Sequence, residues 1–95
     1  MPLPYIGFIK IINNWIWKNK KFCENLEKEQ QQMLTDIVFT KEEIKQATSK
    51  HEWMILELIQ QARNELLETI TQEIIVNKTK QKIYVDIIKY YHIFG

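Results

Sequence analysis

Glycine and proline are almost absent from this chain of 95 residues, since neither occurs between Gly7 and Gly95. These two residue types most often end helices and build tight turns, so the chain must turn by means of side-chain caps. The same absence excludes phosphate-binding loops and nucleophile elbows, which need glycine where the backbone approaches a ligand closely. We therefore expect a few long helices joined by short polar corners.

Cysteine and histidine are also scarce, and this limits the chemistry available to the chain. Cys23 is its one cysteine, so no disulfide forms within the chain, and apolar helical neighbours predict a core position for it. His51 and His92 lack the spacing of a zinc site, and no Glu-x-x-His pattern accompanies the glutamates. We expect no catalytic residues, no metal site, no cofactor and no small-molecule substrate, and therefore no enzyme.

The composition predicts one packed domain with an uneven distribution of charge. The chain is 45% hydrophobic and 12% aromatic, and its formal net charge is only +1. Lysines dominate residues 1–23 and 77–95, whereas residues 24–76 carry most of the acidic side chains. Either these opposite charges meet when helices fold antiparallel, or the basic ends form a surface for an anionic partner.

Helical spacing of apolar residues predicts four helices in a single domain covering residues 1–95. Their expected bounds are about 5–33, 41–48, 50–76 and 80–93. Capping boxes support two of the boundaries, because Thr40 is followed by Glu43 and Ser49 by Glu52. One helix running straight through 41–76 is the alternative.

Residues 80–94 are open to two readings. Ile83, Val85 and Ile87 alternate as in a strand, yet Tyr84, Ile88 and Tyr91 continue a helical face. We favour a helix because the sequence offers no partner strand. The apolar stripe over residues 53–75 predicts a helix that packs along its length against another. The predicted fold is all-α, a hairpin or bundle of three to four helices that self-associates.

Part of the chain resembles a known family. Trp15 is followed by a basic run, by Glu24-Asn25-Leu26, and then by a predicted corner, Leu34-Thr35-Asp36-Ile37-Val38-Phe39-Thr40-Lys41-Glu42-Glu43-Ile44. This pattern resembles the YjiS-like family of small, mostly uncharacterised bacterial proteins over residues 15–45. The chain departs from the family where Val38 replaces the corner glycine and where lysines replace arginines. The resemblance implies a small regulatory protein acting around RNA or stress responses.

The apolar segment 3–17 lacks the features of a signal peptide and is too short and too interrupted to span a membrane. We therefore expect a soluble, cytoplasmic protein. The predicted function is that of a non-enzymatic interaction or regulatory module that works by helix–helix packing, most simply as a homodimer or larger homo-oligomer. The predicted interaction surface comprises Phe8, Ile12, Trp15, Trp17, Trp53, Ile55, Leu58, Ile59, Leu66 and Ile70.

Two other functions remain open at this point. Lys18, Lys20 and Lys21 are candidate contacts to an anion, so a small RNA-associated regulator is one alternative. A peripheral membrane protein is the other, because Trp15 and Trp17 beside these lysines resemble an interfacial helix.

Overall fold

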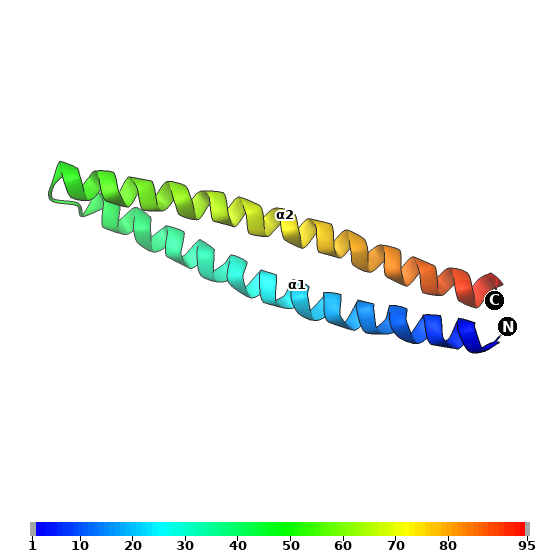
Figure 1. Ribbon diagram of the computed structural model, residues 1–95. Coiled ribbons are helices and arrows are strands. Elements are labelled where there is room, and N and C mark those ends of the chain that lie inside the picture. Colours follow the sequence, from blue (N-terminus) through cyan, green and yellow to red (C-terminus); the bar gives the residue numbers. More distant parts are fainter. Residues whose placement is uncertain (1, 95) are drawn as a thin grey trace. The chain divides into compact units, whose positions relative to one another are not determined.

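The computed structural model describes residues 2–94, with side chains described over residues 7–92. Two helices, α1 (Pro2–Lys45) and α2 (Lys50–Phe94), account for this part of the chain, and it contains no strand (Figure 1). The all-α prediction is confirmed, and residues 80–94 are helical as favoured. The number of helices is corrected from three or four to two.

The corners predicted near Thr40 and at residues 77–79 are wrong, because each lies inside a helix. The expected helix 5–33 lies inside α1, which also contains residues 41–45 of the expected helix 41–48, whereas residues 46–48 lie in the turn. Those expected over 50–76 and 80–93 are both parts of α2. Thr40 donates its hydroxyl hydrogen to the Asp36 carbonyl oxygen at 2.8 Å, as a threonine inside a helix does. Thr79 bonds the Ile75 carbonyl oxygen in the same way at 3.0 Å.

The one turn between the helices uses the second predicted capping box. Ser49 accepts a hydrogen bond through its hydroxyl oxygen from the backbone N–H of Glu52, at 3.1 Å. The Glu52 carboxylate reaches back and accepts from the backbone N–H of Thr48 at 3.4 Å. The helix boundary predicted at about residue 50 is therefore confirmed, with Ser49 as its N-cap.

Contacts divide the chain into two units, each containing a segment of both helices. Unit 1 comprises residues 1–25 and 74–95, and unit 2 comprises residues 26–73. Buried side chains in unit 1 include Ile12, Cys23 and Ile74, which confirms the core position of the cysteine. Those in unit 2 are Leu26, Ile37, Thr40 and Gln60. Two of the four are polar, so the core of unit 2 is not purely hydrophobic.

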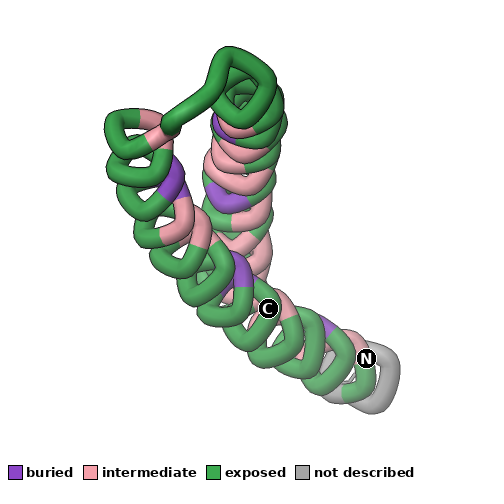
Figure 2. The backbone as a smooth tube through the Cα atoms, turned by 90° about the vertical axis from the view of Figure 1, so that its left-hand side faces the viewer, coloured by how far each residue is buried: buried purple, intermediate pink, exposed green. Residues whose placement is uncertain are grey.

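Buried and half-buried positions recur along each helix at alternating intervals of three and four residues (Figure 2). In α1 they include Ile9, Ile12, Ile16, Asn19, Cys23, Leu26, Gln30, Met33, Ile37, Thr40 and Ile44. In α2 they include Leu56, Gln60, Arg63, Leu67, Ile70, Ile74, Asn77, Gln81, Tyr84, Ile88 and Tyr91. Such alternation is the heptad pattern of a coiled coil. We call these positions the seam.

Candidate interaction surface

In unit 1, aromatic pairs flank the seam and an amide bridge crosses it. The rings of Phe8 and Tyr91 lie 5.0 Å apart between centroids, and those of Trp15 and Tyr84 lie 5.7 Å apart. The Asn19 side-chain amide donates to the Gln81 amide oxygen at 3.0 Å and to the Asn77 carbonyl oxygen at 2.7 Å. In these contacts the residue numbers rise along α1 while they fall along α2. The two helical segments of unit 1 are therefore antiparallel.

Polar side chains also cross the seam of unit 2. Gln30 donates to the Thr71 hydroxyl oxygen at 3.1 Å. Arg63 donates from Nη1 to the hydroxyl oxygen of Thr40 and to the Asp36 carbonyl oxygen, the latter at 3.2 Å. Each bond is specific to one alignment of the two helices, because a shift by one turn would leave its donor facing an apolar neighbour. The polar groups therefore fix the register of the pairing.

Gln60 is an exception among the polar side chains of this seam. It is only 8% exposed, and its Oε1 atom has no hydrogen-bond partner among the residues that the structure describes. A buried acceptor without a partner costs stability. This position is therefore a local weakness in the pairing of unit 2.

Sequence reasoning missed these polar seam residues, although a signal for them was present. In α1, the alternating spacing of three and four residues includes Asn19, Gln30 and Thr40 without a break. Gln60, Arg63 and Gln81 continue the pattern in α2 in the same manner. Counting only apolar residues breaks the heptad at each of these positions and hides it.

In unit 1, an exposed apolar surface lies beside the seam. Its large exposed side chains are Ile11, Trp15 and Phe22 of α1 and Val76 and Ile83 of α2, each between 45% and 52% exposed. We call this set the apolar face of unit 1.

Side chains from both helices meet in an open groove at this face. The groove is lined by Trp15, Lys18, Asn19, Phe22, Lys80 and Tyr84. Lys18 and Lys80 are exposed, so two ammonium groups border the aromatic walls. The groove therefore suits a partner that is both apolar and anionic.

Unit 2 also carries an exposed apolar surface beside its seam. Ile59 and Leu66 each precede a seam residue of α2, and Ile55 lies one helical turn before Ile59. Together with Phe39 of α1 they form the apolar face of unit 2, with exposures from 38% for Ile59 to 66% for Phe39.

Carboxylates border this face. Glu29, Asp36 and Glu43 each precede a seam residue of α1. Each heptad has two seam positions. In an antiparallel pair, the residues immediately before the first of these two positions lie on the same side of the seam in both helices. The three carboxylates therefore lie along the side that carries Ile59 and Leu66.

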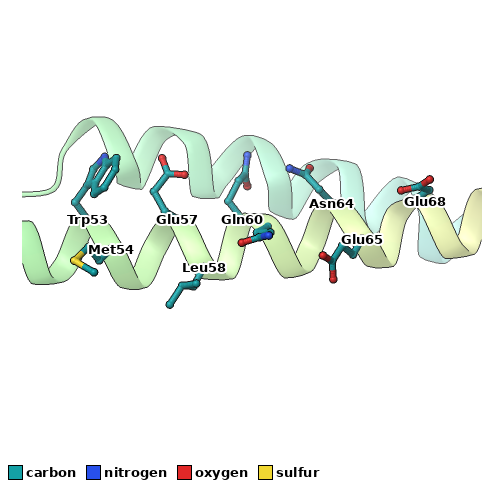
Figure 3. A pocket seen from close by; sticks show the side chains of 9 residues that line it. Trp53, Met54, Glu57, Leu58, Gln60, Asn64, Glu65 and Glu68 are labelled. Atoms are coloured by element: carbon teal, nitrogen blue, oxygen red, sulfur yellow. The ribbon is translucent and has the colours of Figure 1, made fainter.

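A hollow along α2 of unit 2 does not form a binding site for a small ligand. Its lining comes from α2 alone and comprises Trp53, Met54, Glu57, Leu58, Gln60, Gln61, Asn64, Glu65 and Glu68. Figure 3 shows these side chains leaving the helix in different directions, with Glu57 and Leu58 on different sides. No group of three metal-ligating side chains occurs among the described residues. The hollow thus gathers no convergent set of functional groups.

The residues predicted to form an interaction surface separate into two groups. Trp15, Trp17, Trp53, Ile55, Leu58, Ile59 and Leu66 are exposed. Ile12, by contrast, is only 1% exposed, and Phe8 and Ile70 are half-buried in or beside the seam. These three side chains hold the two helices together and offer little area to a partner.

The three lysines predicted as anion contacts are all exposed on α1. Lys21 lies 3.7 Å from the Glu24 carboxylate, and its ammonium stands 6.0 Å from the centre of the Trp17 ring. Lys18 lines the groove of unit 1, whereas Lys20 is not among the groove residues. The three lysines therefore do not form one convergent site.

No family model, no curated protein and no solved structure matches this chain. Its resemblance to the YjiS-like family stays a prediction, and residues 34–44 on which it partly rests are continuous helix. Over the described residues, neither helix contains a stretch both long enough and apolar enough to cross a membrane. The proposals below accordingly start from the geometry of the two units.

Proposed function

We propose that the chain is a non-enzymatic interaction module that acts by packing its exposed helix faces against another helical surface. The observation that carries this proposal is the pair of apolar faces that remain after the seam is complete. In unit 1, Trp15 and Phe22 are 45% and 48% exposed although the seam beside them is closed. In unit 2, Leu66 is 52% exposed beside a similarly closed seam.

The total surface supports the same proposal. The chain exposes 7481 Å². A compact single-chain protein of its mass, 11.6 kDa, would expose only about 5,800 Å². The excess exceeds the roughly 800 Å² that each partner buries in a standard interface. One helical partner on these faces, in an interface of standard size, would bury about half of this excess.

Photo-cross-linking inside expressing cells tests this proposal. We would place a photoreactive phenylalanine analogue at Trp15 or at Leu66, one in each apolar face. The matched controls carry it at Lys20 or Gln61, which are also exposed but lie on the other side of the seam. Cross-linked protein at the two apolar positions, and not at the controls, is the expected result. Equal labelling at all four positions, or none, would contradict the proposal.

A second candidate function rests on the charge of unit 1. This unit carries eight lysines against two carboxylates, a formal charge of +6. Such a surface can attract nucleic acid, with Trp17 available for stacking beside Lys21. Replacing Lys18, Lys20 and Lys21 by glutamine should then flatten the salt dependence of RNA binding. Binding that keeps its full salt dependence in this variant would contradict the candidate.

A further inference from the structure

We propose that the helical partner is a second copy of this chain in the opposite sense, with unit 1 of one copy packed on unit 2 of the other. This inference rests on the proposed function, since it names the partner of the same two apolar faces. It adds an orientation and a set of charge contacts that the proposed function does not contain. A closed dimer would repeat the contact twice, as two-fold symmetry requires.

Opposite net charge is the first argument for this pairing. Unit 1 has a formal charge of +6, from eight lysines and two carboxylates. Unit 2 carries five basic and ten acidic side chains, a formal charge of −5. Like units placed together would repel each other, whereas unlike units attract. Net charge therefore favours the opposite sense over the parallel one.

The positions of the charges give the second argument. Lys18 and Lys80 border the apolar face of unit 1, and both line its groove. Glu29 and Glu43 flank the apolar face of unit 2, each one residue before a seam position of α1. Charges that flank an apolar strip in this way set partner choice and orientation in coiled coils. The lysines of one copy would thus meet the carboxylates of the other around an apolar centre.

The apolar faces themselves give the third argument. Trp15, Phe22 and Ile83 of unit 1 are matched in unit 2 by Phe39, Ile59 and Leu66, all of them at least 38% exposed. Within each unit, the apolar face includes residues that immediately precede the first seam position of a heptad, namely Trp15 and Phe22 in unit 1 and Ile59 and Leu66 in unit 2. Packing one on the other would bury large apolar side chains from both copies.

Two charge-reversed variants test the inference. The first, K18E with K80E, makes the face of unit 1 acidic. The second, E29K with E43K, makes the flank of unit 2 basic. Each alone places like charges across the contact, and we expect its dimer dissociation constant to rise about tenfold or more at low salt. An equimolar mixture of the two restores attraction at both contacts and should recover nearly wild-type affinity.

Matched controls carry the same change of charge on the other side of the seam. K20E with K82E serves for unit 1, and E57K with E68K serves for unit 2, since these four residues are exposed and flank the opposite side. We expect dissociation constants within about threefold of wild type for both controls. Circular dichroism verifies that every variant remains helical.

Zero-length carbodiimide cross-linking of mixed ¹⁴N and ¹⁵N chains reports the orientation directly. Mixed-isotope peptides should join Lys18 or Lys80 of one copy to Glu29, Asp36 or Glu43 of the other. This readout does not depend on any substitution, so a variant that fails to fold leaves the test intact. Mixed-isotope links found only between residues of the same unit would overturn the inference.

Failure of this inference can be told apart from failure of the proposed function. A purified chain that stays monomeric, or that binds anionic phospholipid vesicles or RNA through the Trp15 face instead, overturns the second-copy partner. Photo-cross-linking of Trp15 and Leu66 to a different protein in cells would leave the proposed function standing in that case. If the chain forms a dimer whose dissociation constant is unchanged by both charge reversals, the proposed orientation is wrong but the second-copy partner stands.

Discussion

Arg63 of α2 donates a hydrogen bond to the hydroxyl oxygen of Thr40, which is completely buried near the C-terminal end of α1. The same guanidinium reaches the Asp36 carbonyl oxygen, 3.2 Å away. Thr40 in turn donates to that carbonyl oxygen, so three groups from two helices share one network. This network places a charged group in the seam of unit 2 and aligns the two segments.

Thr40→Val should therefore destabilise the fold by about 1.5–3 kcal/mol, because a charged donor loses its buried acceptor while the shape is kept. The matched control is Thr35→Val, which removes an exposed threonine with the same kind of bond, to the Gln31 carbonyl oxygen. Urea denaturation measures both. Equal stability losses in the two variants would show that the Arg63 bond contributes nothing.

Ser49→Ala should cost about 1 kcal/mol, because it removes the N-cap of α2. The hydroxyl accepts from the Glu52 N–H at 3.1 Å, and alanine offers no acceptor. Ser49→Asp should stay within a few tenths of wild type, since aspartate caps equally well. Thermal unfolding of both variants provides the measurement. An alanine variant as stable as the aspartate variant would argue against a working cap at this position.

Asn19→Ala should lower the free energy of unfolding by about 1 kcal/mol relative to Asn25→Ala. Both substitutions give the same gain in helix propensity, since both positions lie inside α1. Only Asn19 bonds across the seam, to Gln81 and Asn77. Urea titrations of both variants measure the difference in their free energies of unfolding, which is the contribution of the Asn19 bridge. A difference of zero would show that this bridge does not stabilise the register of the helices.

Gln60→Leu should stabilise the chain by about 1 kcal/mol, because it removes a buried acceptor that lacks a partner. Gln61→Leu is the matched control, since its side chain is exposed next to the seam. We expect the control to change the urea midpoint little. A destabilised Gln60→Leu variant would indicate that the amide has a partner in solution, such as a bound water molecule.

Local chemistry made much of this fold predictable from the sequence. The lack of glycine and proline predicted long helices, and the box from Ser49 to Glu52 marked the one boundary that exists in the described part of the chain. Cys23 was expected in the core and is buried there. Each of these predictions depends on residues within one or two turns of each other.

Long-range partners explain what the sequence did not predict. Thr40 followed by Glu43 has the pattern of a capping box. Its hydroxyl instead donates to the Asp36 carbonyl oxygen within α1 and accepts a hydrogen bond from Arg63, which is 23 residues away in the sequence. The corner predicted over residues 34–44 is likewise wrong, since these residues lie inside α1 and Leu34 and Phe39 among them are 40% and 66% exposed. A polar residue can occupy the seam only when its partner faces it, and that partner is visible only after the helices pair.

The exposed apolar faces could be recognised from the sequence only in part. Trp15, Ile59 and Leu66 were predicted to meet a partner, and their exposure leaves them available for one. Phe22, Phe39 and Ile83 were not selected, because their role depends on which side of the seam they flank. The heptad positions of both helices must be known before that side can be assigned.

Sedimentation equilibrium of the wild-type chain beside Trp15→Gln with Leu66→Gln tests the central claim most directly. Our account predicts that the wild type approaches twice the chain mass of 11.6 kDa at high micromolar concentration. It predicts that the variant, which loses one anchor from each apolar face, sediments at the mass of one chain while keeping its helical circular dichroism. A wild type of single-chain mass at every concentration, or a variant that associates as strongly as wild type, would contradict it.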